Sequence, residues 1–250
     1  MNIYIGYDSR EDLAYQVCSH SIKSKSDFAN IHPLKLNNLR EKGYYTRGED
    51  KLGSTEFTFS RFLVPILNEY KGWALFCDCD LLFLNPIEEL FSLVDDKYAV
   101  MCAQHDYNPK GNTKMDGRLQ SIYPRKNWSS VVLWNCEHPS NKNITTKLIN
   151  DPETTGKYLH RFSWLKDEEI GKISHEWNWL VGWYDEPKDG HPKAIHYTEG
   201  GPWFPEYRFC DYHDIWKTLS THMLVTMMHP SGRHHTSPIP FHHNHDQNPD

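Results

Sequence analysis

Two aspartates flank a cysteine at positions 78–80, directly after an apolar run, and their types and spacing are suited to chemistry. In an extended segment the side chains of residues i and i+2 share a face, so Asp78 and Asp80 should point to the same side. Neighbouring carboxylates repel each other where water is scarce unless a cation lies between them. Oxygen ligands favour a hard divalent ion such as Mg²⁺ or Mn²⁺, which also binds phosphate groups. A solvated acidic turn is the alternative, and the apolar residues on both sides argue against it.

A histidine and a glycine pair near the C-terminal end are suited to the same site. His196 follows a short apolar run, and a histidine at a strand end can complete a carboxylate metal site. Gly200 and Gly201 let the backbone approach a phosphate group closely and present N–H groups to it. Cys77 and Cys79 are expected to be core thiols, because a zinc site needs about four ligands and no second Cys or His pair lies nearby.

Alternating strand and helix patterns must position these residues. A β-rich run at 2–7 precedes apolar residues at helical spacing over 11–22, which is the start of an α/β sheet. Further strands are predicted at 32–36, 73–84, 98–103, 128–135 and 193–204. Further helices are predicted at 60–70, where Pro65 favours a kink, and at 85–91, 143–150, 174–184 and 214–228. Loops are predicted at 37–54 and 104–127.

Length and composition set the remaining bounds. The 250 residues, with 38% hydrophobic and 24% charged, can form one domain over 1–228, followed by a flexible His/Pro-rich tail over 229–250. A net charge of -6 argues against a generally basic nucleic-acid-binding surface. The six cysteines lack the dense spacing of a disulfide framework, and no apolar stretch is long enough for a signal peptide or transmembrane segment. A cytoplasmic location is therefore predicted.

Several segments together resemble the nucleotide-sugar glycosyltransferases that have the GT-A fold. These segments are IYIGYD, FSRFLVPIL, FCDCDLLFL, WSSVVLWN and HYTEGGPW. Their order and spacing are most similar to glycosyltransferase family 8, which contains glycogenin and bacterial lipopolysaccharide galactosyltransferases. The resemblance covers about residues 1–136 and 174–205. It implies an α/β, GT-A (Rossmann-like) fold whose mixed, mostly parallel central sheet is flanked by helices, with an aromatic-rich acceptor region in the C-terminal part.

The resemblance also implies roles for individual residues. Asp78, Asp80 and His196 would ligate Mn²⁺ or Mg²⁺. The nucleotide-sugar donor would be bound by Tyr7 or Tyr15 and Asp8 at the base, Arg61 as an anchor, Asp78 at the ribose, and Gly200, Gly201 and Trp203 beside the diphosphate. Glu176 or Asn178 would lie near the reacting carbon. The chain departs from the family at Gly201, where a lysine is common, and at Trp128-Ser129-Ser130, where the family has Asn-Ala-Gly.

The implied reaction is metal-dependent transfer of a sugar, with retention, from a UDP-sugar to a carbohydrate or lipid-linked glycan acceptor in polysaccharide biosynthesis. A haloacid-dehalogenase-like phosphohydrolase also places D-x-D after an apolar strand. Its motif usually lies on the first strand and has Thr or Val where this chain has Leu82. A catalytically silent sugar-binding protein on the same fold is a third reading, and the intact metal-ligand set argues against it. The tryptophans of 164–203 suit either pyranose stacking or an aromatic core.

Overall fold

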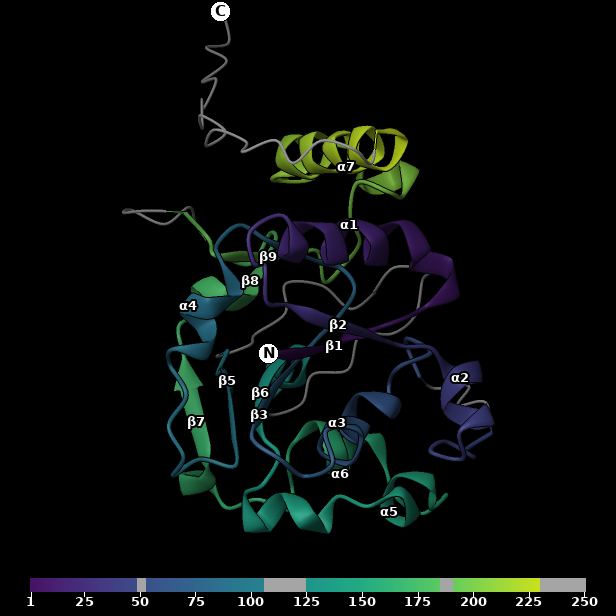
Figure 1. Ribbon diagram of the computed structural model, residues 1–250, viewed down its shortest axis with the longest axis vertical. Helices are drawn as coiled ribbons and strands as arrows, with labels where there is room; N and C mark the ends of the chain where they lie inside the picture. The colour runs from purple at the N-terminus through teal and green to yellow at the C-terminus, as the bar shows by residue number, and fades with distance from the viewer. Residues whose placement is uncertain (49–52, 106–124, 185–190, 230–250) are drawn as a thin grey trace, which may run out of the picture.

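The structure is a computed structural model that describes residues 1–48, 53–105, 125–184 and 191–229 (Figure 1). The larger of two sheets is made of β1 (Asn2–Gly6), β2 (Asn30–Leu34), β3 (Trp73–Cys77), β5 (Val100–Ala103), β6 (Val131–Asn135) and β7 (Ile170–Ile173). Their order across the sheet is β2-β1-β3-β6-β5-β7. β6 runs antiparallel to both neighbours, and every other adjacent pair is parallel. The mixed, mostly parallel sheet predicted from the sequence is confirmed.

The central strands of this sheet are buried almost throughout, because they carry continuous apolar runs and have helices on both faces. In the parallel register of β1 and β3, Ile5 lies opposite Cys77. Both strands therefore end at the same edge of the sheet. Asp8 follows the first strand and Asp78 follows the second, so this edge carries both aspartates.

The smaller sheet consists of β4 (Leu81–Phe83), β8 (Trp179–Leu180) and β9 (Ala194–His196), in the order β4-β9-β8. The prediction of one strand over 73–84 is therefore wrong, since β3 and β4 belong to different sheets. A single straight strand would carry both carboxylates into the interior of one sheet, whereas the turn at Cys79-Asp80 keeps them at its edge. In the antiparallel register of β4 and β9, Leu81 lies opposite His196. This pairing brings His196 next to the turn.

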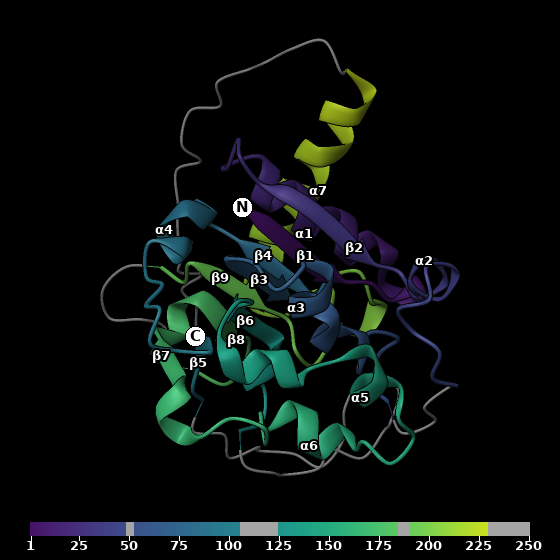
Figure 2. The ribbon, with the colours of Figure 1, turned by 60° about the horizontal axis from the view of Figure 1, so that its bottom comes forward.

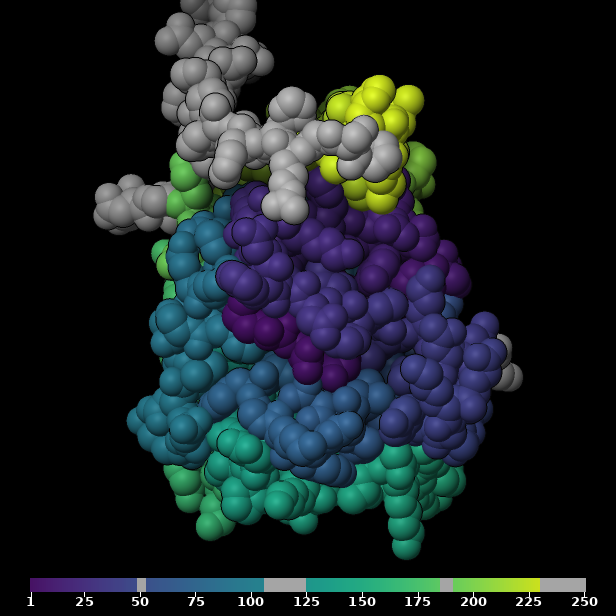
Figure 3. Space-filling view, viewed as in Figure 1, coloured from purple at the N-terminus to yellow at the C-terminus, as the bar shows by residue number. Residues whose placement is uncertain are grey.

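Helices cover both faces of the larger sheet. α1 (Asp12–Lys23) lies on one face, and α3 (Val64–Leu67), α5 (Thr146–Asn150) and α6 (Gly156–His160) lie on the other (Figures 1 and 2). α7 (His213–Met228) packs on the outer side of α1 (Figure 3). The short helices α2 (Leu36–Glu41) and α4 (Ile87–Phe91) lie at the two sides of the molecule in Figure 1. In the described parts of the chain, no helix is both long and apolar enough to cross a membrane.

A second core lies between α1, the smaller sheet and α7. It is formed by Val17, Leu82, Ile195, Tyr197, Trp216, Leu219 and Met223. α1 also contributes Cys18 and Ile22 to the main core under the larger sheet. The two cores therefore share one helix.

Several other predicted loops and helices differ in part from the structure. The loop predicted at 37–54 contains most of α2, and the helix predicted at 60–70 divides into a 3₁₀ helix, Ser60–Leu63, and α3, with Pro65 in the first turn. Residues 174–184 do not form the predicted α-helix. A short 3₁₀ helix, His175–Asn178, leads into β8, because Trp179 suits a pleated strand paired with β9. Most of the loop at 104–127 and the tail at 229–250, apart from His229, lie outside the described residues.

Candidate active site

Asp78, Asp80 and His196 converge at the turn between the two sheets. One potential ligand atom of each residue lies within 4.8 Å of the other two. Backbone hydrogen bonds fix the turn from both sides, because the Asp78 N–H donates to Ser130 O at 2.9 Å and the Tyr197 N–H donates to Asp80 O at 3.0 Å. The structure thus brings together the three residues predicted to ligate a metal.

The surroundings of Asp80 fit a bound cation. Its Oδ1 is buried, lies 3.2 Å from His196 Nε2, and accepts no hydrogen bond from any described residue. A buried carboxylate oxygen without a hydrogen bond is costly, and a cation held between it and its neighbours removes that cost. Two carboxylates and one imidazole suit a divalent ion such as Mn²⁺ or Mg²⁺.

Arg61 holds Asp78 from the protein side. Its Nη1 donates to Asp78 Oδ1 at 2.8 Å and to Ser129 O at 3.1 Å. The guanidinium lies 5.0 and 5.2 Å from the ring centroids of Phe57 and Phe76, where cation–π attraction adds to the ion pair. This arrangement fixes the carboxylate and compensates the buried arginine charge.

Asp8 is fully buried, and its hydrogen bonds come from its own loop and from Glu56. Its carboxylate accepts hydrogen bonds from the backbone and side chain of Arg10, at 2.8 to 3.0 Å, and from the Glu56 N–H at 3.1 Å. Burial raises the pKa of Asp8, but the hydrogen bonds from Arg10 and Glu56 outweigh it and leave the pKa below its ordinary value. Asp8 therefore fixes two residues that line the neighbouring pocket.

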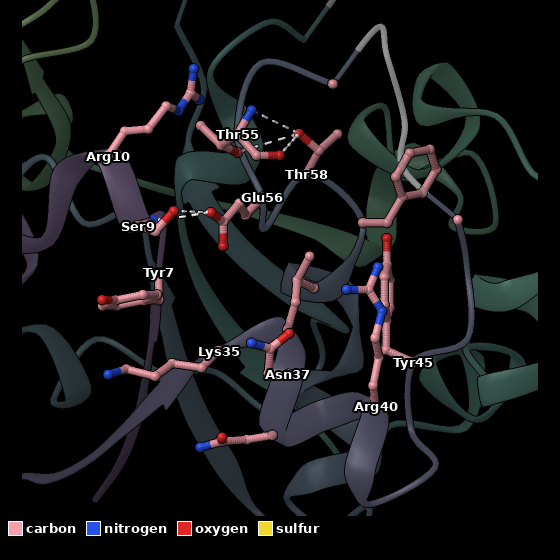
Figure 4. Close-up of a pocket in the computed structure, with 15 residues that line it drawn as sticks. Tyr7, Ser9, Arg10, Lys35, Asn37, Arg40, Tyr45, Thr55, Glu56 and Thr58 are labelled. Atoms are coloured by element: carbon pink, nitrogen blue, oxygen red, sulfur yellow. Dashed lines mark hydrogen bonds between the residues drawn. The ribbon is translucent and has the colours of Figure 1, made fainter.

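A pocket of about 860 Å³ opens at the end of β1 (Figure 4). It is lined by Tyr7, Ser9, Arg10, Lys35, Leu36, Asn37, Asn38, Arg40, Tyr45, Gly48, Gly53, Thr55, Glu56, Thr58 and Phe59. Lys35 Nζ lies 4.2 Å from the ring centroid of Tyr7, whose hydroxyl donates to Asp12 at 2.7 Å. That hydrogen bond raises the pKa of Tyr7 to about 12. Tyr15 is buried behind Tyr7, with 5.3 Å between ring centroids, so Tyr7 is the ring that faces the pocket.

The Gly200–Trp203 segment is held by packing. A Cβ on Gly201 would lie 2.1 Å from the Trp203 ring, so only glycine allows this close approach. Gly200 has a φ of 134°, which also favours glycine. The Trp203 ring packs on Tyr197 and Trp216, while its Nε1 is buried and donates to no described residue.

Glu176 and Asn178 differ in their exposure and in their contacts. Glu176 is partly exposed and is not a member of the metal-ligand cluster. Asn178 is fully buried directly behind His196, with its Oδ1 2.8 Å from His196 Nδ1. Their predicted place near the reacting carbon stays a prediction.

Sequence reasoning missed two buried groups beside the site. Burial, with smaller effects from His196 and His175, lowers the pKa of His105 to about 3, and its Nδ1 bonds the Tyr184 hydroxyl. Burial and the charge of Asp80 raise the pKa of Glu11 above its ordinary value, and the Cys79 thiol donates to the Glu11 carboxylate at 3.3 Å. His105 closely follows a predicted strand, and this position at a strand end could have identified it as a candidate site residue. The sequence around Glu11 contains no pattern that predicts its burial.

Comparison with known proteins identifies the family. No protein-family model matches the chain. Protein CDI of Arabidopsis thaliana is 55% identical over 218 residues, which cover 86% of this chain and 83% of the relative. The chain belongs to the CDI family.

Solved structures similar to this CDI-family chain are glycosyltransferases. GlyE of Streptococcus pneumoniae TIGR4 matches 92% of the chain with a TM-score of 0.60 and 16% identity, and the chain spans 63% of it. The bifunctional glycosyltransferase WbbM matches 91% of the chain with a TM-score of 0.62 and 15% identity, and the chain spans 50% of its length. An active-site mutant of LgtC matches 89% of the chain with a TM-score of 0.57 and 12% identity, and the chain spans 96% of its length. The predicted GT-A fold is confirmed, while placement in glycosyltransferase family 8 stays a prediction.

Proposed function

We propose that this protein is a metal-dependent glycosyltransferase that uses a UDP-sugar and a carbohydrate or lipid-linked glycan acceptor, with retention at the anomeric carbon. The observation that carries the proposal is the Asp78, Asp80 and His196 cluster at the edge of a GT-A sheet. The buried Asp80 Oδ1, which lacks a hydrogen bond, supports a cation there. UDP and retention rest on the resemblance to family 8.

Different residues of the site would bind the metal and the different parts of the donor. Asp78, Asp80 and His196 would hold Mn²⁺ or Mg²⁺, which supplies Lewis-acid stabilisation of the departing diphosphate. The pocket at Tyr7 offers a ring for the base, and the basic side chains that line it, Arg10, Lys35 and Arg40, favour an anionic donor.

The segment after β9 would bind the diphosphate. Its donors would be the buried Nε1 of Trp203, which donates to no described residue, and the backbone N–H of Gly201. Glu176, partly exposed in the 3₁₀ helix before β8, is the carboxylate that would act as nucleophile in a double displacement. A front-face attack would need no such carboxylate.

The proposal is tested by incubating the protein with a panel of sugar nucleotides and Mn²⁺ and following nucleotide release with and without glycan acceptors. Asp80→Ala should abolish metal-dependent turnover, because it removes a ligand. Asp95→Ala, which changes a partly exposed aspartate paired with Lys97, is the control and should keep wild-type turnover. Full turnover by Asp80→Ala would refute the metal site.

Two other outcomes would replace the proposal. Hydrolysis of simple phosphomonoesters without sugar transfer would identify a phosphohydrolase. Sugar binding in a calorimetric titration, with no nucleotide binding, would identify a catalytically silent sugar-binding protein.

We also propose a cytoplasmic location and a single domain over 1–228. All six cysteines are free, as expected for a reducing compartment. The helix shared by the two cores supports one domain, since neither core is complete without α1.

A further inference from the structure

The Asn178 side chain lies between His196 and the segment before β6, and it makes three hydrogen-bonding contacts. Its Oδ1 is 2.8 Å from His196 Nδ1. Its Nδ2 is 2.9 Å from Ser130 Oγ and 3.2 Å from Asn127 O. The side chain is fully buried, so these contacts are shielded from water.

These contacts determine which end of the amide faces the histidine. Asn127 O is a backbone carbonyl and can only accept. Ser130 Oγ donates its proton to the same carbonyl at 2.7 Å, so it accepts from Asn178. Both neighbours on this side are therefore acceptors, and the amide must present its NH₂ group to them. The amide oxygen then faces His196.

The orientation of the amide determines the tautomer of His196. An amide oxygen accepts hydrogen bonds but cannot donate them, so His196 Nδ1 must carry the proton. In the neutral ring the lone pair then belongs to Nε2, the nitrogen that lies 3.2 Å from Asp80 Oδ1 in the metal-ligand cluster.

We propose that Asn178 is a positioning residue that fixes His196 in the Nδ1–H tautomer, with Nε2 directed at the metal. The inference rests on the proposed metal-dependent function and gives Asn178 this role in place of contact with the reacting carbon. Partners that bond the second nitrogen of a ligating histidine orient its ring, and losing one typically weakens metal binding about 10- to 100-fold.

The first test needs no substitution. Histidine ¹⁵N NMR of the metal-free wild-type protein, with the His196 signal assigned by its loss in His196→Gln, reports which ring nitrogen carries the proton. We expect Nδ1 to carry a proton, because it faces the Asn178 oxygen, whether or not Nε2 beside Asp80 is protonated as well. An unprotonated Nδ1 would overturn the inference.

The second test compares Mn²⁺ affinities by titration calorimetry. Asn178→Leu removes the acceptor and should weaken Mn²⁺ binding about 10- to 100-fold. Asn178→Asp retains an oxygen facing Nδ1 but sets its second oxygen against the Asn127 carbonyl, so it should keep only part of the Mn²⁺ affinity that Asn178→Leu loses. Equal affinities of Asn178→Leu and wild type would overturn the inference.

A matched control separates positioning from general destabilisation. Asn141 is also fully buried, and its amide donates to Ala99 O and Asn135 O, away from the metal-ligand cluster. Asn141→Leu should therefore lower stability without changing the Mn²⁺ affinity of the folded protein. If wild type binds no Mn²⁺, the proposed metal dependence fails, while the NMR measurement still decides the tautomer separately.

Discussion

The ion pair between Arg61 and Asp78 is mostly buried, with 7% and 14% of the two side chains exposed. Arg61→Met would remove the positive charge and leave the Asp78 carboxylate uncompensated. Breaking a buried pair typically costs about 3–5 kcal/mol, so we expect the free energy of unfolding in urea to fall by about 3 kcal/mol. Lys71→Met, in the exposed pair with Glu69, is the control and should leave the urea midpoint unchanged. Equal effects of the two substitutions would contradict a stabilising role for Arg61.

Gly201 permits a side chain to lie against the backbone. In Gly201→Ala the new methyl group would overlap the Trp203 ring, and overpacking of this kind costs about 1–3 kcal/mol. Urea denaturation should show that loss, and adding Trp203→Leu should restore part of it. Gly156→Ala is the control, because its Cβ would meet its neighbours at ordinary distances of 3.7 and 3.8 Å in the first turn of α6. A destabilisation by Gly156→Ala as large as that by Gly201→Ala would contradict the argument.

At the residue scale, type and spacing were enough to predict the members of the metal-ligand cluster. The D-x-D spacing identified Asp78 and Asp80, and the strand end identified His196. Their supporting contacts could not be predicted in the same way. The bond from Asn178 to His196 joins residues 18 positions apart, and it exists because β8 pairs with β9.

At the scale of elements, α1 and α7 meet at a pair of histidines. His20 Nε2 lies 2.9 Å from His222 Nδ1. Burial lowers the pKa of His20, and His222, Lys25 and Lys23 lower it further. The unfolded chain therefore takes up a proton on His20 at a higher pH than the folded protein. This contribution to stability is complete above the unfolded pKa of about 6.5 and is lost as the pH falls below it.

Urea midpoints at about pH 7.5 and about pH 5.5 test this pair. We expect His20→Gln to reduce the loss of stability on acidification relative to wild type. Thr218→Ala is the control on α7, since Thr218 is exposed and has no titratable side chain, and it should keep the wild-type pH dependence. An identical pH dependence of wild type and His20→Gln would show that the pair contributes nothing.

Element boundaries were harder to predict than element types. The continuous apolar run over 73–84 has the same pattern whether it forms one strand or two, so the sequence alone could not reveal the turn. The tryptophans at 179 and 183 have a helical spacing of four, whereas those at 177 and 179 alternate as in a strand, and pairing with β9 decided between the two patterns.

At the scale of the whole molecule, the shared helix should make unfolding cooperative. Val17 packs in the second core, while Cys18 and Ile22 pack in the main core. Loss of either core removes one side of α1, so tryptophan fluorescence and far-UV circular dichroism should report one coincident transition in urea. Two separated transitions would show that the cores unfold independently.

The turn at Asp78–Asp80 has a consequence for the mechanics of the molecule. Asp78 directly follows a strand of the larger sheet, whereas Asp80 precedes and His196 ends strands of the smaller one. An ion held by all three would be a crosslink between the sheets, in addition to its proposed part in catalysis. The free energy of ion binding would then oppose any motion that tilts one sheet relative to the other. The donor would bind where the two sheets are already held in place by the ion.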